Sequence, residues 1–261
     1  MCTGPISYVG QSALQRDIDD LKSAVDGVPV TDAFLPVVAP ASVVPIREDE
    51  FYSSEEDFVF AVADALNTEY RTICESGLMV QVDDAYLATM WDTMGSPEDM
   101  REYRAWAELR IEALNRALGG IPSERIRYHV CWGSWNAPHV GDVPLRDIVD
   151  LILRVPAGVY AIEQANPRHE HEWQLWAEVK LPAGKKLMPG VISHATNVVE
   201  HPELVAERLL RLAKLVGPEN IQGSTDCGFA QGPFVQRVHP TIMWAKLEAL
   251  VEGARLASAR L

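Results

Sequence analysis

Residues 126–131 read IRYHVC and residues 159–163 read VYAIE, and these two stretches decide the fold. Each is a short run rich in β-branched and aromatic residues that ends in a side chain able to bind a metal ion. A helical pattern lies between the two runs, and strands joined through a helix pair in parallel. The two stretches therefore predict parallel strands whose carboxyl ends carry Cys131 and Glu163.

The same alternation of strand and helix continues outward in both directions along the chain. Strands are expected at residues 32–38, 78–82, 126–130, 159–162, 186–192 and 221–225, with a weak further strand at residues 6–9. Helices are expected at residues 12–25, 53–74, 96–119, from about 144, at 169–179 and 202–215, and from about 240. This order predicts an α/β fold, a TIM-barrel-like (β/α) parallel barrel. A complete barrel has eight βα units, and about six of them are recognisable here.

Composition indicates a globular chain with a large core. The chain has 261 residues, of which 48% are hydrophobic, and we expect one domain over residues 1–261. The 37 acidic residues outnumber the 23 basic ones, so a nucleic-acid partner is not expected. Neither a membrane span nor a signal peptide is recognisable, which favours a cytoplasmic location. Four cysteines suggest a reducing compartment, and Cys2 and Cys74 are interpreted as a terminal residue and a helix residue without metal chemistry.

Metal-binding side chains gather at the predicted carboxyl ends of the strands, which is where active sites lie in parallel α/β proteins. His129 and Cys131 are two residues apart in one strand, so alternation points both to the same side. Glu163 ends the next strand, and Cys227 follows the last one. An imidazole, a carboxylate and two thiolates suit tetrahedral zinc, because soft sulfur ligands favour zinc over magnesium or calcium.

Four motifs resemble those of a known family. They read RYHVCWGSWN at residues 127–136, AIEQAN at 161–166, PGVIS at 189–193 and STDCGFA at 224–230. Together they resemble the catalytic barrel of cobalamin-independent methionine synthase and its shorter relatives, which are related to epoxyalkane:coenzyme M transferase. The resemblance extends from about residue 3 to residue 238. It implies a zinc ion bound by His129, Cys131, Glu163 and Cys227.

The resemblance also implies an activity. The chain is expected to be a zinc-dependent thiol methyltransferase that moves a methyl group from 5-methyltetrahydrofolate, or a related donor, to homocysteine and forms methionine. Zinc lowers the pKa of a bound thiol, so the substrate would bind as a nucleophilic thiolate. Four protein ligands fill a tetrahedron, so one must leave or the site must expand. Glu163 is the hardest base of the set and is expected to be displaced.

Further residues are expected to contact the substrates. The run VQVDDAYLA at residues 80–88 resembles a segment of the family that reads Q-I-D-E-P-A-L, which makes Gln81 and Asp83 candidate substrate contacts. The carboxylate of Asp83 would suit the ammonium group of an amino-acid thiol, although a helix cap or a solvated loop acid is the alternative. Trp132 and Trp135 would form an aromatic wall that binds a cation or a flat donor, or they are packing residues of a lid.

The residues around each histidine outside the proposed ligand set indicate its role. The acid-catalyst histidine of the family lies in a D-x-H-S-P-like stretch, and the corresponding residues 193–197 read SHATN. His194 is the only candidate for this catalytic role, but its one-residue offset on a strand would turn it to the other face. The run HEHE at residues 169–172 is interpreted as a charged helix start, and His139 as a surface residue. Asp226, beside Cys227, is a candidate for orienting a metal ligand.

The first part of the barrel differs from the family. Full-length relatives carry two more βα units ahead of the segment TGPISY, residues 3–8, so we expect an open barrel edge that favours self-association. Two alternatives to the methyltransferase remain. One is a zinc-dependent alkyltransferase or lyase that joins a coenzyme M-like thiol to an epoxide, with Arg168 as a candidate contact for a sulfonate. The other is a non-catalytic zinc-binding barrel fragment.

Overall fold

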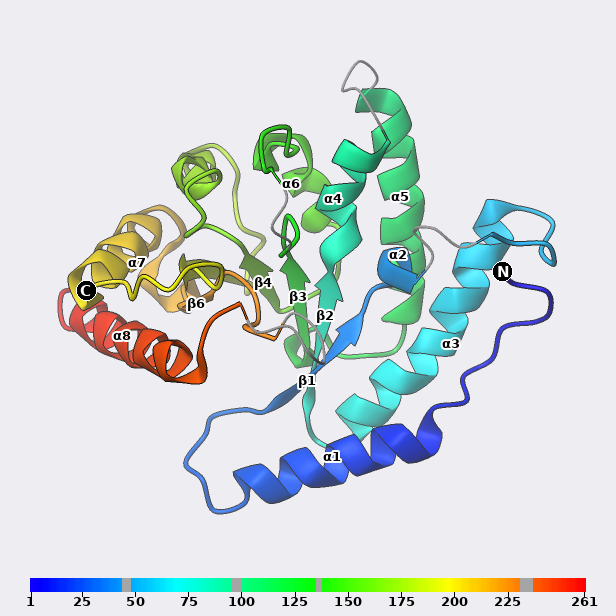
Figure 1. Cartoon of the computed structure of the whole chain (residues 1–261), viewed down its shortest axis with the longest axis horizontal. Helices are drawn as coiled ribbons and strands as arrows, with labels where there is room; N and C mark the ends of the chain where they lie inside the picture. Colours follow the sequence, from blue (N-terminus) through cyan, green and yellow to red (C-terminus); the bar gives the residue numbers. More distant parts are fainter. Residues whose placement is uncertain (44–47, 95–99, 135–137, 231–236) are drawn as a thin grey trace. The chain divides into compact units, whose positions relative to one another are not determined.

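The computed structural model describes residues 1–43, 48–94, 100–134, 138–230 and 237–261. In this part of the chain the strands are β1 (Phe34–Val38), β2 (Met79–Asp84), β3 (Ile126–Val130), β4 (Val159–Ile162), β5 (Lys186–Ile192) and β6 (Ser224–Thr225). Their hydrogen-bonded order follows their order in the chain, from β1 to β6. The pairs β1–β2, β4–β5 and β5–β6 are parallel (Figure 1).

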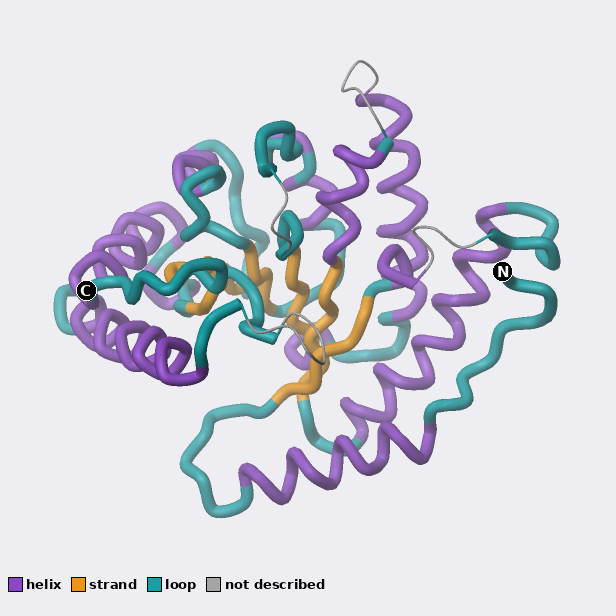
Figure 2. Tube along the Cα trace, viewed as in Figure 1, coloured by secondary structure: helices purple, strands orange, loops and turns teal. Residues whose placement is uncertain are grey.

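Helices occupy most of the connections between strands (Figure 2). The α-helices are α1 (Gln11–Val25), α2 (Pro40–Val43), α3 (Glu55–Glu75), α4 (Ala85–Thr93), α5 (Met100–Ala117), α6 (Val149–Ile152), α7 (Pro202–Val216) and α8 (Pro240–Ser258). Short 3-10 helices are η1 (Ser123–Arg125), η2 (Leu145–Asp147), η3 (Glu170–Ala177) and η4 (Pro218–Asn220). Among the helices of the described ranges, none combines the length and apolar character needed to cross a membrane.

The chain divides into two compact units, and the first consists of Met1–His129 and Arg154–Gly158. Within it, α3 packs against α5 and against β2. Helix α3 begins after Ser54, whose hydroxyl accepts a hydrogen bond from the backbone N–H of Asp57 at 3.1 Å. Three acidic residues in its first turn complement the positive end of the helix dipole.

The second unit consists of Val130–Leu153 and Val159–Leu261. Its helix α7 packs against α8 and against β5, and the side chains between them form an apolar core that includes Val191 and Leu209. The two helices touch at Gly253, because a Cβ atom there would lie 2.4 Å from the Cβ of Val205. Burial of each large apolar side chain in this core contributes on the order of 2 kcal/mol. This packing holds β5, which pairs with β6, and both strands precede the polar residues described below.

The predicted (β/α) order is confirmed, and the bounds of β3, β4 and β5 match those expected. Residues 6–9 were predicted as a weak strand, and this was wrong: the backbone N–H of Ile6 donates to the hydroxyl of Tyr52 at 2.8 Å rather than to a strand. Strand β6 is shorter than predicted, because its register with β5 shifts between Gly190 and Ile192. Residues 96–99, the expected helix start, lie outside the described residues.

Several helices also differ from the prediction. The helix expected at residues 169–179 is the 3-10 helix η3, and the one expected from about residue 144 is divided into η2 and the short α6. Helices α2 and α4 were not predicted. Helix α4 begins directly after β2, where Asp84 caps it by accepting a hydrogen bond from the N–H of Leu87 at 3.2 Å. A strand and a helix joined without a loop give no separate sequence signal for the helix.

Candidate metal centre

Two cysteines from distant parts of the sequence meet in the second unit. Cys131 follows β3 and is buried, and Cys227 follows β6 and is half-buried. A hydrogen bond with Cys227, together with burial and the charge of Glu163, raises the pKa of the Cys131 thiol well above its usual value. The Cys131 thiol therefore keeps its proton more firmly than an ordinary thiol, and a soft cation bound by both sulfur atoms would replace that proton.

Three of the four predicted ligands come together. The ligand atoms of His129, Cys131 and Cys227 all lie within 4.8 Å of one another. His129 and Cys131 are two residues apart at the end of β3, as the period-2 alternation of a strand requires. One imidazole nitrogen and two sulfurs at this spacing suit a zinc ion, for which sulfur and nitrogen are the usual structural ligands.

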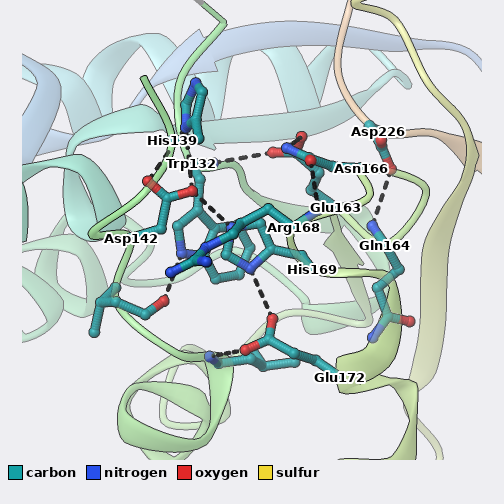
Figure 3. Close-up of polar contacts among 12 residues, drawn as sticks. Trp132, His139, Asp142, Glu163, Gln164, Asn166, Arg168, His169, Glu172 and Asp226 are labelled. Atoms are coloured by element: carbon teal, nitrogen blue, oxygen red, sulfur yellow. Dashed lines mark hydrogen bonds and ion pairs between the residues drawn. The ribbon is translucent and has the colours of Figure 1, made fainter. Parts of the chain in front are cut away.

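The fourth predicted ligand, Glu163, lies in a neighbouring group of buried ionisable residues. Its carboxylate, His194 and Asp226 offer ligand atoms within 4.8 Å of one another. One oxygen of Glu163 accepts a hydrogen bond from the backbone N–H of Trp132 at 3.1 Å, and the other from the side-chain amide of Asn166 at 3.0 Å (Figure 3). Each oxygen of the carboxylate thus has a hydrogen-bond donor within the protein.

Asp226 connects the ends of β4 and β6. Its Oδ1 accepts hydrogen bonds from the backbone N–H groups of Gln164, at 2.9 Å, and Ala165, at 2.7 Å. Burial, and next the charge of Glu163, raises the pKa of Asp226 well above its usual value. Strand β5 also approaches Asp226 closely, because a Cβ atom on Gly190 of β5 would lie 2.0 Å from Oδ1 of Asp226. Asp226 therefore fixes the backbone on which Cys227 is placed.

His194 lies just beyond the end of β5, so strand alternation does not decide its direction. Its imidazole is buried, and its Nε2 is 2.8 Å from the hydroxyl of Ser134. The preceding residue is held by a buried ion pair: the N–H of Ser193 donates to Glu200 at 2.8 Å, and Glu200 pairs with Lys246 of α8 at 2.8 Å. The imidazole of His194 lies near Glu163 and Asp226, and its catalytic role stays a prediction.

The two predicted aromatic contacts have different outcomes. Trp132 is buried, and its indole N–H donates to the carbonyl of Val143 at 2.7 Å. Its ring stacks on the imidazole of His169 with centroids 4.2 Å apart. Trp135 lies outside the described residues. A contact between Trp132 and a substrate stays a prediction, whereas its packing within the unit is an observation.

The predicted substrate contacts at the end of β2 lie in the first unit. The side-chain amide of Gln81 donates to Oδ1 of Asp83 at 2.9 Å, and both residues are half-buried. The next residue, Asp84, is buried and accepts a hydrogen bond from the hydroxyl of Tyr128 at 2.8 Å. Burial raises the pKa of Asp84 to about 6. The helix-capping alternative considered for Asp83 is thus realised by Asp84.

Sequence reasoning missed a buried polar cluster around His169. The run HEHE at residues 169–172 was interpreted as a charged helix start, but the side chain of His169 is only 3% exposed and contacts Asp142 and Glu172. Glu170 points elsewhere and forms two 3.0 Å hydrogen bonds with Arg208 of α7. The signal was the spacing of three between His169 and Glu172, which brings side chains together in a helical turn.

Known proteins resemble this chain in sequence and in fold. Residues 37–243 match the family model described as the catalytic domain of cobalamin-independent synthase. The chain belongs to this family. A solved structure of a B12-independent methionine synthase from Shewanella sp. W3-18-1, in complex with selenomethionine, is similar with a TM-score of 0.75 and 21% identity. The similarity covers 99% of this chain and 70% of that one, and it confirms the predicted fold.

Curated relatives match most of this chain but little more than half of their own length. The chain is 26% identical over 239 residues to 2-hydroxypropyl-CoM lyase of Xanthobacter autotrophicus, which covers 82% of this chain and 58% of that protein. It is 23% identical over 223 residues to methionine synthases of Saccharolobus islandicus and Saccharolobus solfataricus, which covers 84% of this chain and 57% of those proteins. The chain therefore spans less than two thirds of the length of these relatives.

Proposed function

We propose that this chain is a zinc-dependent thiol methyltransferase that transfers a methyl group from 5-methyltetrahydrofolate, or a related donor, to homocysteine and forms methionine. The observation that supports this proposal best is the convergence of His129, Cys131 and Cys227 within 4.8 Å. Methionine synthases among the relatives support the choice of reaction. The same residues could belong to a closed structural zinc site, so the chemistry of Glu163 decides between the two.

His129, Cys131 and Cys227 would hold the zinc ion, with Glu163 as a fourth and exchangeable ligand. Zinc bound there would lower the pKa of the substrate thiol and keep it as a nucleophilic thiolate at neutral pH. The two cysteine thiolates add negative charge, which keeps electron density on a third sulfur.

Glu163 is suited to exchange because both of its oxygens have hydrogen-bond donors of their own. The backbone N–H of Trp132 and the amide of Asn166 lie 3.1 and 3.0 Å from these oxygens. A buried carboxylate that loses a ligand contact is costly unless such donors satisfy it. These two donors would allow Glu163 to leave its ligand position when a substrate thiol arrives.

Two further roles complete the proposal. His194 would deliver a proton to the departing part of the methyl donor, and the hydroxyl of Ser134, 2.8 Å from its Nε2, would orient the ring. Asp83 would pair with the ammonium group of homocysteine, and Gln81 would hold the Asp83 carboxylate through their 2.9 Å hydrogen bond. These are assignments for binding and proton transfer that follow the family pattern.

A second candidate function is a lyase or alkyltransferase that joins a coenzyme M-like thiol to an epoxide. The match to 2-hydroxypropyl-CoM lyase favours it. A sulfonate would need a cation in place of the Asp83 carboxylate. The guanidinium of Arg168 donates to the carbonyl of Val140, and Arg168 is exposed. An acidic residue at the proposed amino-group position therefore favours homocysteine over a sulfonated thiol.

Product analysis tests the proposal. Zinc-loaded protein is incubated with homocysteine and 5-methyltetrahydrofolate and, separately, with coenzyme M and an epoxide, and the products are identified by mass spectrometry. We expect methionine in the first mixture and no alkylated coenzyme M in the second. The Cys227→Ser variant serves as the inactive control. Alkylated coenzyme M alone would establish the second candidate, and no product in either mixture would contradict both enzymatic functions.

A further inference from the structure

The buried histidine outside the proposed ligand set is held at both of its ring nitrogens. Nε2 of His169 lies 2.9 Å from a carboxylate oxygen of Asp142, and its Nδ1 lies 2.8 Å from a carboxylate oxygen of Glu172 (Figure 3). The three residues form what we call the His169 cluster. A carboxylate at each nitrogen is satisfied when both nitrogens carry protons, so His169 is an imidazolium ion. Burial lowers its pKa, but the hydrogen bonds to Asp142 and Glu172 raise it to about 9.

The His169 cluster joins the segments that follow β3 and β4. Asp142 belongs to the first segment, and His169 and Glu172 belong to the second. The second oxygen of Glu172 accepts a hydrogen bond from the backbone N–H of Leu145 at 2.7 Å. Asp142 also lies 3.1 Å from Nδ1 of His139, a partly exposed residue. Two carboxylates thus face the ring of His169, and the carboxylate of Glu163 adds a further negative charge nearby.

His169 contacts both residues that donate hydrogen bonds to Glu163, although at other atoms than the two donors. Its ring stacks on the indole of Trp132 with an interplanar angle of 30°, an arrangement that a cation over an aromatic face stabilises. Its backbone N–H donates to the carbonyl of Asn166 at 2.9 Å. Trp132 and Asn166 in turn donate to the two oxygens of Glu163, at 3.1 and 3.0 Å.

We propose that His169 is a positioning residue for Glu163. The His169 cluster fixes Trp132 through ring stacking and Asn166 through the backbone, and these two donors fix the carboxylate. In this role His169 acts on Glu163 through Trp132 and Asn166. This positioning role rests on the proposed function, in which Glu163 is an exchangeable ligand. The contacts of His169 with Trp132 and Asn166 do not depend on the reaction.

The test compares the wild type with the triple variant H169F/D142N/E172Q. Phenylalanine keeps a flat ring against Trp132, and the two amides avoid leaving buried carboxylates without a counter-charge. The matched control is H139Q, which also removes a partner of Asp142 but leaves the stacked ring in place. N166A is the positive control, because it removes one donor to Glu163 directly. Thermal unfolding of each protein verifies that it folds cooperatively.

Two measurements are made. In the metal-free proteins, hydrogen exchange of the Trp132 backbone N–H should become at least about tenfold faster in the triple variant and stay unchanged in H139Q. In proteins loaded with Co²⁺ as a spectroscopic substitute for zinc, the affinity for homocysteine should fall about tenfold in the triple variant and in N166A. The affinity for Co²⁺ should change by less than about threefold, because the ligands proposed to hold the ion are intact.

The outcomes separate the two proposals. A folded triple variant with wild-type exchange at Trp132 and wild-type homocysteine affinity would overturn the positioning role. So would equal effects in H139Q, because the effect would then not pass through the stacked ring. If the wild type binds Co²⁺ but no thiol, the proposed function fails, and the exchange measurement still decides the role of His169. If the triple variant does not fold, H169Q, which keeps one donor, replaces it with the same expected directions.

Discussion

The carboxyl ends of β2 and β4 each present an acidic residue followed by a second polar residue, yet their surroundings differ. At β2, the buried Asp84 accepts hydrogen bonds from a helix N–H and from a tyrosine, and Asp83 is half-buried beside an amide. At β4, Glu163 accepts two hydrogen bonds and lies with two more buried ionisable groups near a pair of cysteines. A strand end therefore offers a carboxylate, whereas the groups around it determine what the carboxylate does.

The cysteines are expected to differ strongly in how much they contribute to zinc affinity. Replacing Cys227 with serine removes a sulfur ligand, and we expect zinc affinity to fall by more than about 100-fold, beyond the usual cost of losing an outer-shell partner. Competition with a chromophoric chelator measures the affinity. Cys74→Ser is the matched control, since Cys74 is a half-buried residue of α3 in the first unit. The zinc affinity of this variant should equal that of the wild type. A similar loss in both variants would contradict the assignment.

The next effect concerns the close approach of β5 and β6. Gly190→Ala would place a Cβ atom 2.0 Å from Asp226 Oδ1 and 2.6 Å from its Cα, so the backbone before Cys227 must move. We expect a loss of about 2–3 kcal/mol in the free energy of unfolding, measured in urea. Gly4→Ala, which meets no atom within 4 Å, should unfold as the wild type does. Equal stability of the two variants would argue against tight contact at Asp226.

The buried acid at the end of β2, Asp84, should make the free energy of unfolding depend on pH. Because the pKa of Asp84 is raised to about 6 in the folded protein, the native state binds a proton more tightly than the unfolded state does. Ionisation of Asp84 therefore destabilises the fold as pH rises from about 4 through about 6. Asp84→Asn keeps a good helix cap and removes this charge. Relative to the wild type, the metal-free variant should gain about 2 kcal/mol between pH 4 and pH 7.

Urea unfolding at the two pH values checks this expectation. A stability difference that stays constant with pH would mean that Asp84 does not titrate in this window. Asp83→Asn is the matched control at the neighbouring position, where the side chain is half-buried.

The smallest expected effect concerns substrate binding by Asp83. Asp83→Asn removes the charge proposed to pair with the ammonium group of homocysteine, and we expect KM for homocysteine to rise about tenfold with little change in kcat. Steady-state kinetics with homocysteine, and with a thiol that lacks the amino group, make the measurement. The second thiol should show no change, and an equal rise in KM for both would contradict the role of Asp83.

Local patterns predicted much of the fold. Short runs rich in apolar and aromatic residues predicted the bounds of β3, β4 and β5, and most residues of these strands are buried. The spacing of His129 and Cys131 predicted two side chains on one side of a strand, and the structure brings both near Cys227. These successes depend on periodicity over a few residues. They fail for residues 6–9, whose β-rich composition is not paired with any strand of the described ranges.

The buried polar cluster could not be predicted in the same way. Asp142 and His169 are 27 residues apart in the chain, and no local pattern links them. Glu200 and Lys246, which hold the segment of His194, are 46 residues apart. Each of these side chains, taken alone, suggests an exposed charged residue. Their burial becomes intelligible when the opposite charges are seen to face one another.

Zinc X-ray absorption with and without homocysteine tests most directly whether the two cysteines hold an ion that accepts a substrate thiol. We expect about two sulfur ligands per zinc near 2.3 Å in the protein alone, and about three after homocysteine is added. A sulfur count that stays the same with every thiol added would indicate a closed structural site. A count of zero or one in the protein alone would mean that Cys131 and Cys227 do not share the metal.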